Sequence, residues 1–267
     1  MRLIVTGSSS GIGLSLTKQL LSQGHEIWGL ARSEQAKHHN NFKSNICDVS
    51  VWKSVESTAK VIAQRWSDLD GLIHCAGSQG SVGPSMSLDP QEWSRTVSTN
   101  LDGLFYTLRA FYPLLEKSPS RTKIICFSGG GATGPRPNFS AYAAAKAGLV
   151  RLVETLACEW KNLPIDINAI APGAIKTRLT EEIIQLGPEK VGENEFNQAT
   201  KVMKSGGGSI DKVFELVQFL LSEQSDGVTG KLLAAQWDPW KKIPENRESF
   251  ASSETYTLRR VVPKEWS

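Results

Sequence analysis

The fold is decided near the start of the chain, by the stretch Leu3-Ile4-Val5-Thr6-Gly7-Ser8-Ser9-Ser10-Gly11-Ile12-Gly13. Its apolar beginning predicts a short buried strand, and residues 11–22 have the spacing of a helix. Glycines in the turn between them permit close approach of the backbone to a pyrophosphate, whose charge would face the helix N-terminus. No lysine follows the last glycine, so the turn is not a Walker loop. It predicts a dinucleotide site formed by Gly7, Ser9, Ser10, Gly11, Ile12 and Gly13.

Short apolar runs and longer segments of helical period alternate along the rest of the chain. The predicted strands are 3–5, 26–30, a third that ends at 47, 71–75, 124–127, 165–170 and a last one near 230–234. The predicted helices are 11–22, 51–66, 100–115, 142–160 and 210–221. Unbroken apolar strands are typical of a parallel sheet covered on both faces. We therefore expect an α/β protein with a Rossmann-like, doubly wound parallel sheet in three αβα layers.

The length of 267 residues suits one large domain, which we place at residues 1–235. Residues 236–267 differ in composition, because prolines punctuate them and they hold three of the eight tryptophans. We interpret them as a C-terminal extension that packs on the domain or on a partner subunit, near the mouth of the site. Trp237 and Trp240 are large enough that we expect both to be covered.

Composition excludes several classes of function. Hydrophobic residues make up 40% of the chain, which is enough for a core, and the net charge of +3 is too small to indicate a nucleic-acid partner. The four cysteines lack the spacing of a metal site, and no apolar run is long enough to span a bilayer. With no recognisable leader, we expect a cytoplasmic protein without a metal, nucleic-acid or membrane partner.

Two polar residues follow the second and third predicted strands and bear on the choice of cofactor. Arg32 stands where a carboxylate would bind the ribose hydroxyls of NAD, and a guanidinium there favours the 2′-phosphate of NADP(H). A solvated surface arginine is the alternative. Asp48 would accept from the adenine amine, and an N-cap of the following helix is an equally good interpretation.

Tyr142 and Lys146 are the strongest candidates for catalysis. A spacing of four residues puts both side chains on one face of a helix, so they can share a pocket. A nearby ammonium favours the phenolate and lowers the pKa of a tyrosine from its ordinary value of about 10. The pair predicts a tyrosine that donates or accepts a proton near neutral pH.

With these motifs, residues 1 to about 235 resemble a short-chain dehydrogenase/reductase of the single-domain type. The matching pieces are residues 6–13, Asp48-Val49, residues 74–77, Asn100, residues 142–146, Asn168, and Pro172-Gly173 with Thr177. The resemblance implies that Tyr142 is the acid/base, that Lys146 holds the cofactor ribose and lowers the pKa of Tyr142, and that Asn100 binds a water linking Lys146 to solvent. It implies further cofactor contacts from Val49, Ala76, Gly77, Tyr142, Lys146, Pro172, Gly173, Ile175 and Thr177.

The chain departs from the family pattern at the end of the fifth predicted strand. The family has a serine there that binds the substrate oxygen, but Gly129 takes that position and Ser128 lies one residue before it. Ser128 is our candidate, since a glycine run can loosen the alternation of a strand. Thr133, Ser140 or a backbone N–H group are alternatives. His74 replaces a usual asparagine, and we expect a satisfied interior residue.

The expected activity is an NADP(H)-dependent interconversion of a ketone and a secondary alcohol. A polar segment over 178–204 suits a lid for a hydroxylated or sugar-like substrate. The tail resembles that of a subgroup associated with bacterial surface-sugar pathways. A 3-oxoacyl thioester reductase and a cofactor-binding scaffold without turnover are the alternatives. Surplus apolar positions on the helices at 100–115 and 142–160 predict a homodimer or homotetramer.

Overall fold

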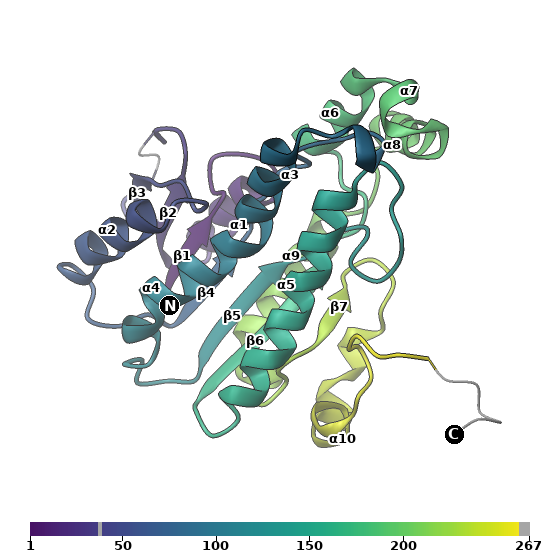
Figure 1. Cartoon of the computed structure of the whole chain (residues 1–267). Coiled ribbons are helices and arrows are strands. Elements are labelled where there is room, and N and C mark those ends of the chain that lie inside the picture. Colours follow the sequence, from purple (N-terminus) through teal and green to yellow (C-terminus); the bar gives the residue numbers. More distant parts are fainter. Residues whose placement is uncertain (37–38, 262–267) are drawn as a thin grey trace.

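A computed structural model of the chain describes residues 1–36 and 39–261. Its strands form one parallel sheet in the order β3-β2-β1-β4-β5-β6-β7 (Figure 1). The strands are β1 (Arg2–Thr6), β2 (Glu26–Ala31), β3 (Phe42–Ile46), β4 (Gly71–His74), β5 (Thr122–Phe127), β6 (Ile165–Ala171) and β7 (Leu232–Ala234). The helices are α1 (Gly11–Ser22), α2 (Trp52–Ala63), α3 (Pro90–Val97), α4 (Gly103–Leu115), α5 (Ser140–Glu159), α6 (Arg178–Leu186), α7 (Pro188–Val191), α8 (Glu193–Ser205), α9 (Ile210–Leu221) and α10 (Arg247–Ser252).

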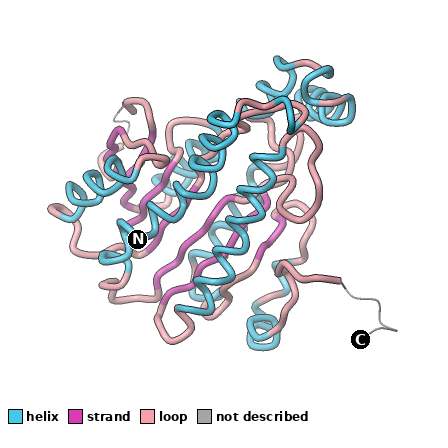
Figure 2. Tube along the Cα trace, viewed as in Figure 1, coloured by secondary structure: helices cyan, strands magenta, loops and turns pink. Residues whose placement is uncertain are grey.

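Helices cover both faces of the sheet, which confirms the predicted Rossmann-like αβα fold (Figure 2). One core joins the sheet to α2, α4 and α5 through buried residues such as Val55, Leu104 and Leu149. The other joins it to α1 and α9 through Leu16 and Val213. Strand order reverses at β1, which lies between β2 and β4. In sheets of this kind the ligand crevice lies at that point, outside the carboxyl ends of the strands.

The helical stretch predicted over 100–115 extends further toward the N-terminus than expected, because another helix precedes it. Helix α3 begins at Pro90, where the Asp89 carboxylate accepts from the backbone N–H groups of Gln91 and Glu92 at 2.9 and 3.0 Å. A π-helical turn, Ser98–Asp102, then joins α3 to α4. Helix α3 escaped prediction because Thr96 is its one buried residue, so few apolar side chains mark the segment as a helix.

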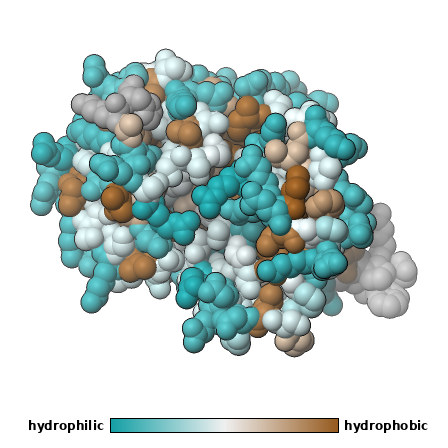
Figure 3. Space-filling model, turned by 90° about the horizontal axis from the view of Figure 1, so that it is seen from above, coloured by the Kyte–Doolittle hydropathy of each residue, from teal (hydrophilic) through white to brown (hydrophobic). Residues whose placement is uncertain are grey.

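The segment after β6 folds into α6, α7 and α8, which lie together at the top of the view in Figure 1. Seen from that side, the molecule is largely hydrophilic, with small separate hydrophobic patches (Figure 3). The inner side of these helices is apolar, since Ile183, Val191 and Ala199 are buried in one cluster with Phe139 and Tyr142. The segment expected to be a polar lid is thus polar outside and apolar inside.

The strand β7 forms one edge of the sheet, and the chain that follows it lies along this edge. The backbone N–H of Leu232 donates to the Tyr256 carbonyl at 2.8 Å, and the Leu258 N–H donates to the Glu154 carboxylate. Trp240 is buried and stacks on Phe219. These contacts hold the described part of residues 236–267 against the domain, and residues 262–267 lie outside the described chain.

Trp237 corrects one expectation, because it is 72% exposed. Its neighbour Gln236 carries the polar contacts at that position, donating to the Pro172 carbonyl at 2.9 Å and accepting from the Ser209 N–H at 3.1 Å. The tryptophan ring remains at the rim of the cavity described below.

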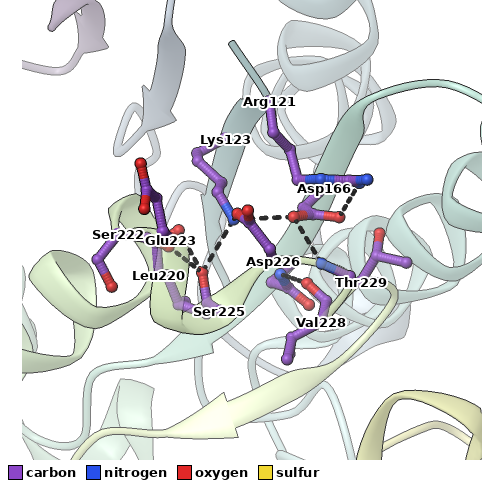
Figure 4. A network of polar contacts seen from close by, with 12 residues as sticks. Arg121, Lys123, Asp166, Leu220, Ser222, Glu223, Ser225, Asp226, Val228 and Thr229 are labelled. Carbon is purple, nitrogen blue, oxygen red and sulfur yellow. Dashed lines mark hydrogen bonds and ion pairs between the residues drawn. The ribbon is translucent and has the colours of Figure 1, made fainter. Parts of the chain in front are cut away.

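A buried network of charges lies at the amino ends of β5 and β6 (Figure 4). The Lys123 ammonium lies 2.8 Å from Asp166 and 2.7 Å from Asp226 and donates to Ser225 at 3.1 Å. The side chains of Lys123 and Asp166 are only 3% and 2% exposed, and Arg121 adds a second cation beside Asp166 at 3.1 Å. The network joins the starts of β5 and β6 to the loop before β7.

Candidate active site

The turn after β1 forms a cradle whose open side faces the crevice. Gly7 has φ of +68° and donates its N–H to the Leu30 carbonyl at 2.8 Å. A Cβ there would lie 2.9 Å from the Ala76 nitrogen, and one at Gly13 would overlap the Gly7 carbonyl, so both positions require glycine. Ala76 in turn donates its N–H to the Thr6 hydroxyl at 3.1 Å.

The cradle fits the pyrophosphate of a dinucleotide. Ser10 occupies the N-cap of α1, but its side chain makes no capping hydrogen bond to any described residue. The first N–H groups of a helix need acceptors from outside it, and an anion satisfies them. Ser9 and Gly11 complete the rim of the turn, and the space beside Gly11 is open up to the Thr177 methyl, 3.8 Å from a Cβ built there.

Residues predicted for the adenosine end lie beside β2 and β3. Arg32 is exposed directly after β2. One Asp48 oxygen accepts from the backbone N–H and hydroxyl of Ser50, at 3.0 and 2.7 Å, which stabilises the turn before α2. Val49 is buried against Gly103 at the start of α4.

Residues predicted for the nicotinamide end follow β6. Pro172, Gly173, Ile175 and Thr177 line one cavity of about 680 Å³ together with Ile12 from the cradle. Gly173 has φ of +84°, which turns the chain sharply away from the sheet. The loop after β6 therefore closes over the cradle from the side of α6.

Tyr142 and Lys146 line the same cavity, and both are buried. The Lys146 ammonium donates to the Phe127 carbonyl at 2.8 Å and lies 5.6 Å from the centre of the Tyr142 ring. Burial lowers the pKa of Lys146 to about 8, since desolvation disfavours the charged form. The predicted placement of this pair on one face of a helix, α5, is confirmed.

The electrostatics of Tyr142 differ from the expectation. Burial raises the pKa of its phenol, Arg136 opposes that shift, and Glu195 reinforces it. Arg136 is thus a second cation beside Tyr142, since its guanidinium carbon lies 5.3 Å from the ring centre and the Lys146 ammonium lies 5.6 Å from it. One N–H of the Lys146 ammonium donates to the Phe127 carbonyl.

Asn100 lies in the π-helical turn, where an extra residue reorients its side chain. Its amide donates to the Ser78 and Thr96 carbonyls, both at 2.9 Å, and accepts from the Ser78 N–H at 3.3 Å. A Cβ built on Gly77 would lie 2.8 Å from the Asn100 oxygen and 3.5 Å from the Lys146 ammonium. Asn100 thus fixes the loop after β4 beside Lys146.

Ser128 and Gly129 both line the cavity. A Cβ built on Gly129 would overlap the Tyr142 hydroxyl, so the glycine holds the position nearest the phenol. The Ser128 hydroxyl is buried and finds no hydrogen-bond partner among the described residues. Of the alternative donors, Thr133 lines the cavity, whereas Ser140 accepts from Trp93 at 3.1 Å.

His74 is fully buried, but only one of its two ring nitrogens has a hydrogen-bond partner among the described residues, which corrects the expectation of a fully satisfied interior residue. One ring nitrogen shares a hydrogen bond of 3.1 Å with Thr6, and the other has no partner among the described residues. Burial lowers its pKa to about 3, so the ring is neutral. It supports the cradle through Thr6, which also accepts from Ala76.

Three residues that sequence reasoning did not assign to the site form a polar wall of the cavity. Arg136 donates to both oxygens of Glu195 at 2.9 Å and to the Gln79 amide oxygen at 3.1 Å, and it stacks on Phe139. One signal was present, since Arg136 is the only charged residue between the fifth predicted strand and Tyr142.

Comparisons with known proteins agree on one family. Residues 7–236 match the family model described as "Enoyl-(Acyl carrier protein) reductase". The chain is 31% identical to levodione reductase of Leifsonia aquatica over 244 residues, 86% of this chain and 90% of that protein. The crystal structure of levodione reductase is 27% identical, with a TM-score of 0.77 over 87% of this chain and 95% of that one.

A second solved structure, a putative short chain dehydrogenase from Escherichia coli CFT073 complexed with NADPH, is 26% identical. Its TM-score is 0.75, over 88% of this chain and 96% of that one. These comparisons define an NAD(P)-dependent oxidoreductase that acts on CH–OH groups. The chain belongs to the short-chain dehydrogenase/reductase family.

Two further observations concern the described residues alone. They contain no group of three or more His, Cys, Asp and Glu side chains placed to hold a metal ion. None of their helices combines the length and apolar character that crossing a membrane requires.

Proposed function

We propose that this protein uses NADP(H) to interconvert a ketone and a secondary alcohol on a polar, sugar-like substrate, with Tyr142 as the acid/base. The observation that carries the proposal is the shared cavity. It reaches from Ile12 and Thr177, beside the cradle, to the buried pair Tyr142 and Lys146. A cofactor in the cradle and a substrate beside Tyr142 would then meet in one water-poor space.

Different residues bind different parts of the cofactor. The N–H groups at the start of α1 bind the pyrophosphate, Asp48 and Val49 border the adenine, and Lys146 binds the ribose. Ala76, Gly77, Pro172 and Gly173 enclose the cofactor, with Ile175 and Thr177 at the nicotinamide end. The nicotinamide, when bound, supplies or accepts the hydride.

Tyr142 moves the proton that accompanies the hydride. In the reductive direction its hydroxyl protonates the substrate oxygen, and in the oxidative direction its phenolate removes that proton. The Lys146 ammonium beside it restores the proton through Asn100 and water. Arg136 favours the phenolate because its charge opposes the effect of burial on the Tyr142 pKa.

Ser128 is our candidate to donate a hydrogen bond to the substrate oxygen. A buried hydroxyl without a partner is costly in a folded protein, and a ligand oxygen would satisfy it. Thr133 is the second candidate, because it also lines the cavity.

The polar wall supports a hydroxylated substrate, because Gln79 and Arg136, together with the neighbouring cavity residue Gln198, offer donors and acceptors that a hydroxyl group can use. The similarity to levodione reductase supports a small ketone. A substrate from a bacterial surface-sugar pathway stays a prediction from the tail.

The alternative is a 3-oxoacyl thioester reductase. An apolar part of the cavity wall that includes Ile183, Val202 and Trp237 favours it. The description of the family model shares the acyl thioester substrate, although an enoyl reductase reduces a C=C bond and not a ketone. The position of Gly129 favours a third candidate, a cofactor-binding scaffold that has lost turnover.

Oxidation of NADPH, followed at 340 nm with a panel of hydroxyketones and 3-oxoacyl thioesters, tests the three candidates. Turnover of hydroxyketones supports the proposal, and preference for thioesters supports the alternative. If NADPH binds but neither class is turned over, the scaffold is the better description.

Arg32→Ala is expected to weaken the binding of NADPH by about 1–3 kcal/mol and to leave that of NADH unchanged, because only NADPH carries the 2′-phosphate. Titration calorimetry with both cofactors measures this. Arg65→Ala, at an exposed arginine just after the end of α2, is the matched control. Equal affinities of the unmodified protein for both cofactors would count against the choice of NADP(H).

We also propose a homodimer or homotetramer. Phe105 is 48% exposed on α4, and Leu152, Leu156 and Trp160 are partly buried on or beside the end of the neighbouring α5. Light scattering at micromolar concentration is expected to give at least twice the chain mass of 29.2 kDa. A monomer mass would contradict this proposal. A cytoplasmic location stays a prediction from composition.

A further inference from the structure

The polar wall of the cavity pairs two charges from different parts of the fold. Arg136 belongs to the loop between β5 and α5, and Glu195 to the first turn of α8. The guanidinium meets the carboxylate through two parallel hydrogen bonds of 2.9 Å each. Their side chains are 11% and 25% exposed, so water screens the pair weakly.

The guanidinium is held firmly in place. Its central carbon lies 3.8 Å from the centre of the Phe139 ring, and a third hydrogen bond of 3.1 Å runs to the Gln79 oxygen. A bidentate pair with a carboxylate is the geometry in which arginine binds anions most tightly. Glu195 therefore fills the place that a substrate carboxylate or phosphate would take.

The other charged side chains of the cavity leave the Arg136–Glu195 ion pair intact. In the described part of the chain, the charged side chains lining the cavity are Arg136, Lys146, Glu195 and Asp238. Lys146 donates to the Phe127 carbonyl at the cofactor side, and Asp238 accepts from the Ala234 N–H at 2.6 Å. Of the two cations, Arg136 is thus neutralised by Glu195, whereas Lys146 lies where the cofactor ribose is proposed to bind.

We propose that Glu195 makes the site select uncharged ketones and alcohols and reject anionic ones. An anionic substrate would have to displace Glu195 from Arg136 or lie beside a second negative charge in a poorly screened space. An uncharged hydroxylated substrate needs neither, because it can use the free donors of Arg136 together with Gln79 and Gln198. The inference rests on the proposed carbonyl chemistry and narrows its substrate class.

Two ketones of nearly equal shape test the inference: methyl acetoacetate, which is neutral, and acetoacetate, which is anionic. The quantity measured is the ratio of kcat/KM for the anion to that for the ester, with NADPH at saturation. Glu195→Gln keeps the size and one hydrogen bond but removes the charge. It is expected to raise the ratio about tenfold or more, as for one hydrogen bond to a charged group.

Arg136→Gln gives the opposite sign, because it leaves Glu195 charged and unpaired, and it is expected to lower the ratio. Glu193→Gln is the matched control, an exposed carboxylate two residues away in the same turn of α8, and it is expected to change the ratio less than twofold. If Glu195 only latched α8 in place, the Glu195 and Arg136 variants would affect both ketones equally. An unchanged ratio in both would overturn the inference.

A binding measurement separates this inference from the proposed activity. The affinities of benzoate and its uncharged analogue benzamide for the NADPH complex can be compared by calorimetry in the same variants. Tighter binding of benzoate, but not of benzamide, to Glu195→Gln supports charge selection even if no ketone is turned over. Equal effects on both probes would overturn it even in an active enzyme.

Discussion

Replacing Tyr142 with phenylalanine is expected to lower kcat by about 10²–10⁴-fold, because the variant loses the group that transfers the proton. The ring itself is needed for packing, since it is buried against Phe139 and Ile183 below α6. Phenylalanine keeps that packing, so the affinity for NADPH and the melting temperature are expected to stay close to those of the unmodified protein. Steady-state rates and NADPH titration measure both.

Tyr112→Phe is the control for the same chemical change elsewhere. Its hydroxyl makes a single, long hydrogen bond to Glu116 at 3.4 Å on the surface of α4, outside the cavity. That variant is expected to be fully active. Full activity of Tyr142→Phe would instead show that another group supplies the proton.

The largest expected loss of stability comes from the network at the amino ends of β5 and β6. Asp166→Ala leaves Lys123 buried with only the more exposed Asp226 beside it. Breaking a buried ion pair from one side costs about 3–5 kcal/mol, because the remaining charge stays desolvated. Urea unfolding is expected to show a loss of at least about 3 kcal/mol.

Glu56→Ala is the matched control, since Glu56 forms an exposed pair with Lys60 at 3.3 Å on α2, and such pairs contribute about 0–1 kcal/mol. Replacing Lys123 and Asp166 together with Met and Leu is expected to recover most of the stability, because no buried charge then lacks a partner. A loss below 1 kcal/mol in Asp166→Ala would contradict the buried-charge argument.

The sheet could be predicted from the sequence because each strand depends on a short run of neighbouring residues. Leu3, Ile4 and Val5 form an apolar run that has few alternatives to a buried parallel strand, and the glycines after it fit one kind of turn. The pair Tyr142 and Lys146 needed only the period of a helix. For these features, the spacing of neighbouring residues was sufficient.

Other features depend on contacts between distant residues and could not be predicted in this way. Lys123 lies outside the strand predicted over 124–127, yet it belongs to β5 and is buried because Asp166, 43 residues later, pairs with it. The role of Arg136 depends on its ion pair with Glu195, a residue of α8 that is distant in the sequence. The orientation of Asn100 depends on a π-helical turn, for which the sequence shows no periodic signal.

The tail beside β7 has a consequence for self-association. An edge strand with free N–H and C=O groups is a template on which strands of other molecules can add, which leads to aggregation. Residues 253–256 cover this edge, since Tyr256 accepts from Leu232 and the Lys231 ammonium binds the Ser253 and Thr255 carbonyls. Tyr256 and Thr257 also line the cavity. Proteolytic removal of this one segment would therefore make the protein prone to precipitate and open its substrate pocket at the same time.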